Sequence, residues 1–142
     1  MFDRIGLFDT KYRLAADREW MLRAFIAGVA VTELERPVYR YRSHAGSSTM
    51  DRARRNYAAI RREHLDIAAR YLREPEITDS ALRRALRRWH AAEVGMLGWH
   101  YAKRGELAGL PSILADASRL ASLWPLTLAG ETVRHVARRW SK

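Results

Sequence analysis

Cysteine is absent from this 142-residue chain, which excludes disulfide bonds, thiolate metal sites and cysteine nucleophiles. Long hydrophobic runs are also absent. The longest nearly uncharged stretch, residues 120–130, contains Pro125 and is far shorter than the roughly 20 residues that span a bilayer. Residues 1–4 lack the basic start and apolar core of a signal peptide. We therefore expect a soluble or peripheral protein, in the cytoplasm or at the cytoplasmic face of a membrane.

Acidic residues are outnumbered: 16 Asp and Glu stand against 26 Lys and Arg, a formal net charge of +10. Such a surplus attracts polyanions such as nucleic acid, acidic lipid or phosphorylated ligands. The charge is spread over arginine pairs, mostly on the polar faces of helix-like segments, where it also suits a solvated surface. No nucleic-acid-binding module accompanies the charge, so we expect no nucleic-acid partner. The arginine pairs lie at 54–55, 61–62, 83–84, 87–88 and 138–139.

The sequence divides near residue 49. Residues 1–49 mix strand-like and helix-like pieces: a helix from Ala15 to Ala27 that ends at Gly28, and strands over 29–34 and 37–42. Two short strands do not make an independent sheet, so they require partner strands that the sequence does not contain. We therefore expect the chain to be the C-terminal portion of a longer protein, beginning in the middle of a domain.

Residues 50–142 have helical periodicity almost throughout. Helices are expected over 50–73, from a cap at Thr78 or Asp79 to about Lys103, from Pro111 to about 123, and beyond Pro125. The expected fold class is thus an α/β fragment, residues 1–49, followed by a mainly α extension of three to four helices, residues 50–142.

A connected pattern runs through the first part: IGLFD at 5–9, AADREWMLR at 15–23, and then Gly28. Residues 37–49, PVYRYRSHAGSST, follow it. Together these segments resemble the second half of the catalytic domain of family 2 glycosyltransferases, inverting enzymes of the GT-A fold. In that family a G-x-F-D turn precedes an acidic motif ending in Asp and a helix of the form x-x-L-x-x-R. The resemblance covers about 49 residues, and Ala16 departs from it, because the family often has an acidic residue there.

The resemblance implies that Asp17 is the general base, which takes a proton from the acceptor hydroxyl as that oxygen attacks the anomeric carbon. From the residues alone, without the resemblance, Asp17 is explained as the cap of its helix. Arg23 either pairs with a carboxylate, helps to shape the acceptor site, or is an exposed helix residue.

Further site residues follow from the same resemblance. Phe8 and Asp9 would border the acceptor pocket, and Trp20 would stack on a sugar, although a core position suits Trp20 too. His44 would complete the coordination of a divalent ion, Mg²⁺ or Mn²⁺, in the full-length enzyme. The chain has no D-x-D motif to hold that ion, so this chain alone is expected to bind none. The other histidines lack metal-ligand spacing and are expected to be structural.

The expected function is therefore transfer of a sugar from a nucleotide-sugar donor to a glycan or lipid-linked acceptor. Because the donor-binding half is missing, the chain alone is expected to be inactive. The alternative is a basic helical module that docks on an acidic membrane surface or partner protein. That alternative rests on the C-terminal segment, where Trp124 and Trp140 flank apolar residues and Arg134, Arg138, Arg139 and Lys142 supply charge.

Overall fold

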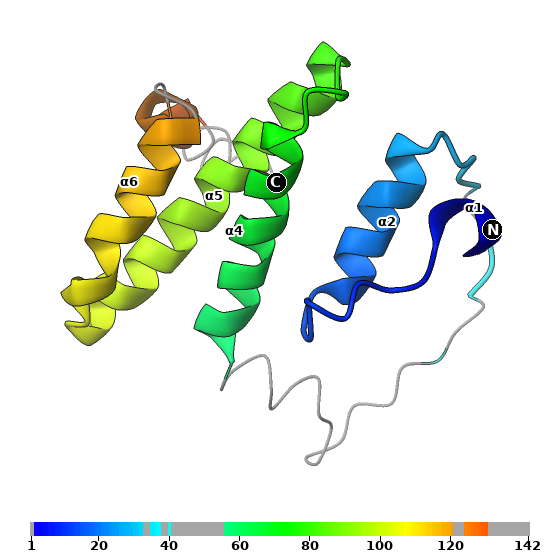
Figure 1. Cartoon of the computed structure of the whole chain (residues 1–142). Helices are drawn as coiled ribbons and strands as arrows, with labels where there is room; N and C mark the ends of the chain where they lie inside the picture. Colours follow the sequence, from blue (N-terminus) through cyan, green and yellow to red (C-terminus); the bar gives the residue numbers. More distant parts are fainter. Residues whose placement is uncertain (1, 33–34, 38–39, 41–55, 121–123, 131–142) are drawn as a thin grey trace. The chain divides into compact units, whose positions relative to one another are not determined.

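A computed structural model describes residues 2–32, 35–37, 40, 56–120 and 124–130 (Figure 1). The chain divides into two compact units, Met1–Ile60 and Arg61–Lys142. The regular structure in the described ranges is helical throughout. The boundary between the two units lies after residue 60. The sequence suggested a change from mixed to helical character near residue 49.

The first unit contains a short helix, α1 (Phe2–Ile5), and a longer one, α2 (Ala16–Ile26). Gly6 ends α1 with a φ of 81°, a left-handed conformation that residues with a Cβ rarely adopt. The connection between the helices buries side chains rather than lying open. The core of this unit consists of Ile5, Tyr12 and Ala15, each less than a tenth exposed.

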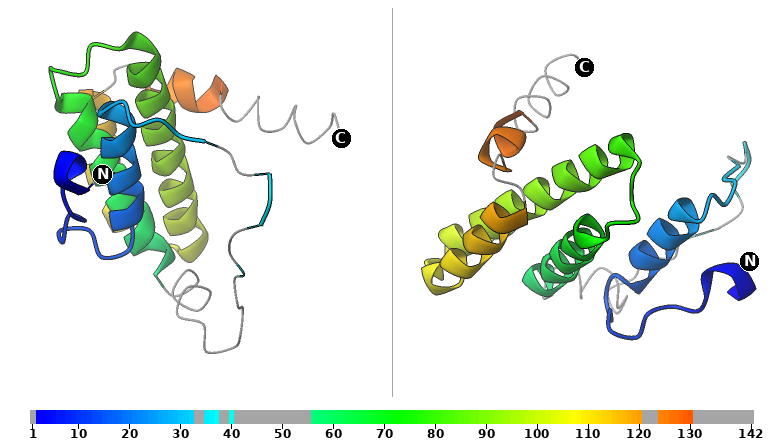
Figure 2. Two further views of the ribbon diagram at one scale, coloured as in Figure 1. Left: turned by 90° about the vertical axis from the view of Figure 1, so that its right-hand side faces the viewer. Right: turned by 45° about the horizontal axis from the view of Figure 1, so that its top comes forward.

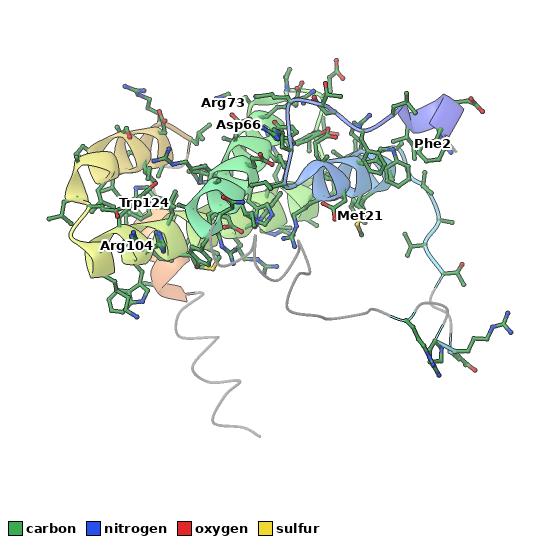
Figure 3. All side chains as sticks on the ribbon, turned by 90° about the horizontal axis from the view of Figure 1, so that it is seen from below. Phe2, Met21, Asp66, Arg73, Arg104 and Trp124 are labelled. Atoms are coloured by element: carbon green, nitrogen blue, oxygen red, sulfur yellow. The ribbon has the colours of Figure 1, made fainter. Side chains whose placement is uncertain are left out.

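The face that α2 buries is not its apolar one. Met21 and Phe25 are 65% and 61% exposed, and Met21 points away from the helix in Figure 3. Glu19 is completely buried instead. Helical spacing of apolar residues correctly predicted this helix and its end near Gly28, but the buried side of the helix is set by polar contacts.

The predicted fold class is wrong. Strands were expected over 29–34 and 37–42, but residues 29–32, 35–37 and 40, which the structure describes, form no strand. A strand requires a neighbour for its backbone hydrogen bonds, and the β-branched residues of this stretch favour a strand only in such a context. Without an adjacent strand the segment stays irregular. The description of residues 1–49 as an α/β piece of a GT-A fold is therefore withdrawn.

The second unit is a set of antiparallel helices (Figures 1 and 2). Its main elements are α4 (Tyr57–Arg73, which enters this unit at Arg61), α5 (Ser80–Arg104), the short 3₁₀ helix η1 (Leu107–Gly109) and α6 (Leu110–Leu120). Residues 124–130 are also helical. Among the described helices, none combines the length and the apolar character that a bilayer crossing requires.

Local chemistry fixes both ends of α5. The Asp79 carboxylate accepts hydrogen bonds from the amides of Ala81 at 2.7 Å and Leu82 at 3.4 Å, so it caps the helix. Gly105 ends it in the left-handed conformation, with a φ of 70°. Both ends confirm the sequence prediction.

Apolar side chains from α4, α5 and α6 form the core of the second unit. Two glycines on α5 let other helices approach closely. A methyl group at Gly95 would lie 2.7 Å from Leu128 Cδ1, whereas one at Gly98 would lie 3.8 Å from Leu110 Cδ2. Fully buried members of this core are Ile67, Val94 and Leu97.

Candidate functional site

The turn that follows α1 is held by one side chain of α2. Arg23 donates from Nη1 to the carbonyl of Ile5 at 2.6 Å and from Nη2 to the carbonyl of Leu7 at 2.7 Å. Its Nε donates to Glu19 Oε2 at 2.9 Å. Arg23 is thus paired with a carboxylate, and its side chain is only 24% exposed.

This arrangement depends on the planar guanidinium. Its donors point in several fixed directions at once, so one side chain reaches two backbone carbonyls and a carboxylate. The carbonyl of Ile5 is among those that the end of a helix leaves without a partner. Glycine suits position 6, between the two residues whose carbonyls Arg23 binds. A Cβ there would lie 3.3 Å from Arg23 Nη1, and a side chain would also strain the positive φ. The turn is therefore a preorganised feature of the first unit.

Trp20, three residues before Arg23 on α2, also binds this turn. Its indole Nε1 donates to the carbonyl of Gly6 at 2.9 Å. Its ring lies 5.4 Å from the ring of Phe2 and 5.7 Å from that of Phe8, centroid to centroid. Phe8 stays half exposed, so this aromatic cluster reaches the surface.

The two carboxylates of the candidate site have different local roles. Asp9 accepts a hydrogen bond from the amide of Lys11 at 2.9 Å, which stabilises its own turn. Asp17 is exposed in the first turn of α2, where Oδ1 accepts from the amide of Arg18 at 2.7 Å. The cap position itself is Ala15, which has no side-chain hydrogen bond. Asp17 is therefore placed at the positive end of the helix with its carboxylate open to solvent.

His44, the expected metal ligand, lies outside the described residues. Within the ranges that the structure describes, no three His, Asp or Glu side chains come together as a group that would hold a metal ion. The expected Mg²⁺ or Mn²⁺ has no ligand set among them.

A second polar cluster, which the sequence analysis did not identify, lies in the second unit. Glu93 on α5 is 1% exposed. Its carboxylate accepts from Arg61 Nη1 at 3.0 Å, from His64 Nδ1 at 3.1 Å and from Trp89 Nε1 at 3.0 Å. The only signal in the sequence was helical spacing. Arg61 and His64 are three residues apart on α4, and Trp89 and Glu93 are four apart on α5, but such spacings are too common to identify a cluster.

The charge state of Glu93 follows from these contacts. Burial on its own would raise the pKa of this carboxyl, but the hydrogen bonds from His64 and Arg61 and the charge of Arg61 outweigh it, so the pKa is lowered. Glu93 is ionised and surrounded by donors. Such a carboxylate holds two helices together but is poorly suited to accept a proton from a substrate.

Histidines inside the second unit have structural surroundings. Burial lowers the pKa of His90, the nearby charge of Arg73 lowers it further, and Asp116 opposes this in part. His90 is 1% exposed and is therefore held neutral near pH 7. His64 is buried as well, at 7% exposed.

No protein-family model, curated protein sequence or solved structure matches this chain. Its function must therefore be argued from its own residues.

Proposed function

We propose that this chain serves in glycosyl transfer and that its first unit supplies the acceptor side of an inverting, family 2-like glycosyltransferase. The observation that carries the proposal is the set of side-chain hydrogen bonds from α2 to the preceding turn. Arg23 and Trp20, from the helical part of the sequence pattern, bind the backbone of the turn that carries Phe8 and Asp9. The two halves of the pattern that suggested a transferase thus form one local structure.

In this proposal Asp17 is the general base. Its exposed carboxylate would accept the proton of an acceptor hydroxyl while that oxygen forms a bond to the anomeric carbon and the nucleotide diphosphate leaves with the bonding electrons. Phe8 on the fixed turn and Trp20 on α2, whose rings lie 5.7 Å apart, would present an apolar face to a sugar ring.

The nucleotide-sugar donor would be bound by residues outside the first unit, as would any divalent ion that accompanies it. We therefore expect the chain alone to show no transfer. The acceptor would be a glycan or a lipid-linked sugar, which suits a protein at the cytoplasmic face of a membrane.

The test begins with the coding DNA upstream of Met1. An in-frame segment with a D-x-D motif would supply the donor site, and the extended protein would then be assayed with a panel of nucleotide sugars. An upstream sequence without such a segment would overturn the proposal for this chain.

In the extended protein, we expect Asp17→Asn to lower kcat by a factor on the order of 10² to 10⁴, the usual contribution of a positioned general base. Donor binding should persist, because Asp17 contacts the acceptor only. Asp116→Asn, which removes an exposed carboxylate from α6, is the matched control and should leave turnover unchanged. Full turnover in Asp17→Asn would remove this residue from the reaction.

A further inference from the structure

Three exposed arginine side chains lie close together on the first turns of α5. Residues 83–88 read RRALRR, and Arg84, Arg87 and Arg88 are exposed. Residues three or four positions apart on a helix are neighbours on its surface, so the three side chains share one side of α5. The first turns of α5 extend beyond the end of α6 (Figures 1 and 2). We refer to these three residues as the arginine cluster.

The acidic residue of α5 and the one that caps this helix bind other groups. Glu93 is 1% exposed and accepts hydrogen bonds from α4. The Asp79 carboxylate accepts from two backbone amides of the first turn of α5. Like charges three or four residues apart on a helix repel each other, so Arg84 repels both Arg87 and Arg88. A bound anion would relieve this repulsion.

The surroundings of the cluster indicate which kind of anion fits. The only exposed large apolar side chain of α5 is Trp99, about 16 Å beyond Arg88 along the helix axis. Protein interfaces and single-stranded nucleic acids both require aromatic or apolar anchors, which the cluster does not provide. A flat bilayer cannot lie along this side of α5, because Leu128 is seated against Gly95 on the same side. A duplex that contacts only the first turns of the helix meets neither obstacle.

Arginine is well suited to phosphate. Its planar guanidinium can donate two parallel hydrogen bonds to one phosphate group. In Arg84 one of the five N–H groups is used within the helix, where Nη1 donates to Ser80 Oγ at 3.3 Å. That bond holds the side chain against the first turn of α5.

We propose that the arginine cluster binds the phosphate backbone of a nucleic-acid duplex without reading its sequence. Contacts to phosphate position a protein on a duplex but carry no sequence information. The expectation of no nucleic-acid partner rested on the lack of a recognisable binding module, and contacts to phosphate alone do not require one. The proposal does not depend on the transferase function.

The experiment measures binding of the full chain to two fluorescently labelled DNA duplexes of unrelated sequence, by anisotropy, between about 50 and 200 mM salt. Three phosphate contacts predict a slope of about −2.7 for log Kobs against log salt, so the affinity should fall roughly 40-fold over this range. Both duplexes should bind equally well. Arg84→Gln and Arg88→Gln should each remove one contact and reduce the fall to roughly 12-fold.

A matched control separates the cluster from the net charge of the chain. Lys103→Gln removes one positive charge from the exposed surface of the same helix, about 22 Å from Arg88 along its axis. The salt dependence of this variant should equal that of the unaltered chain. Circular dichroism checks that every variant keeps its helices.

Four results would overturn the proposal. The first is a salt dependence reduced as much in Lys103→Gln as in Arg88→Gln, which would leave only net charge. The second is a preference for one of the two duplexes, and the third is tighter binding to the separated strands. The fourth is tighter binding to polygalacturonate, or to vesicles that contain phosphatidylglycerol, that Arg88→Gln also weakens, which would assign the cluster to an anionic glycan or lipid.

Discussion

Arg61 Nη1 on α4 lies 3.0 Å from both carboxylate oxygens of Glu93 on α5, 32 residues away in the sequence. This contact neutralises a charge that burial would otherwise make very costly. Because His64 and Trp89 donate to the same carboxylate, the cluster joins α4 to α5 through several hydrogen bonds at one point. Polar contacts of this kind help to fix how the two helices lie against each other.

The first prediction concerns this cluster. Glu93→Gln removes the negative charge but retains the shape, and it replaces one of the two acceptor oxygens by an NH2 group, a donor, in a cluster whose other members, Arg61 and His64, also donate. We expect the free energy of unfolding of the second unit to fall by about 3 kcal/mol, the usual cost of breaking one partner of a buried ion pair. Urea unfolding followed by tryptophan fluorescence in a Trp20→Phe background reports on the second unit alone.

Glu106→Gln provides the comparison for Glu93→Gln. Glu106 pairs with Arg104 at 2.7 Å, but both side chains are about half exposed. Solvent screening makes such pairs weak, so this variant should unfold at the same urea concentration as the unaltered chain. If the two variants were equally stable, Glu93 would have no special role in joining α4 and α5.

The second prediction concerns the pH dependence of stability. The pKa of His90 is lowered from its ordinary value of 6.5, so the unfolded chain binds a proton there before the folded chain does. As the pH falls below about 6.5, the free energy of unfolding should therefore decrease, by up to about 1.4 kcal/mol per pH unit. His90→Phe should remove this component of the slope between pH 6.5 and 5. An unchanged slope would mean that other groups cause it.

The third prediction concerns the turn that α2 holds. Arg23→Lys keeps the positive charge but loses the planar guanidinium, whose three nitrogens donate to the carbonyls of Ile5 and Leu7 and to the Glu19 carboxylate at the same time. We expect faster amide exchange across residues 5–9 and earlier cleavage there by a nonspecific protease. Arg18→Lys, on the exposed side of the same helix, should leave both unchanged. Equal protection in Arg23→Lys would show that charge alone holds the turn.

A feature of this fold was predictable from the sequence when residues close to it in the chain determine it, and not when distant residues do. The ends of α5 were correct because Asp79 and Gly105 act on neighbouring amides and carbonyls. The strands at 29–34 and 37–42 were wrong because a strand is decided by partners elsewhere. Apolar spacing located α2 but gave no indication that Glu19 would be buried while Met21 faces solvent.

The candidate site shows the same division. The sequence pattern brought Asp9, Asp17, Trp20 and Arg23 into consideration, and Trp20 and Arg23 do meet the turn that contains Asp9. The sequence pattern could not show that Trp20 and Arg23 bind backbone carbonyls, because every residue has a carbonyl whatever its type. The Glu93 cluster was invisible for a related reason, since its members come from two helices that only tertiary packing brings together.

The fourth prediction uses two glycines of α5 as a matched pair. Replacing a glycine inside a helix by alanine gains up to about 1 kcal/mol of backbone stability where the new methyl group has room. At Gly98 the nearest atom is 3.8 Å away, so Gly98→Ala should stabilise the second unit by about that amount.

At Gly95 the same substitution places the methyl group 2.7 Å from Leu128 Cδ1, so the leucine side chain must move. We expect Gly95→Ala to be destabilising by about 1 kcal/mol, because overpacking exceeds the gain in helix stability. In a Leu128→Ala background the clash disappears, and the same change should become stabilising. Urea unfolding of the four proteins in this cycle measures the coupling directly. Additive effects of the two substitutions would show that residues 124–130 do not pack against α5 at Gly95.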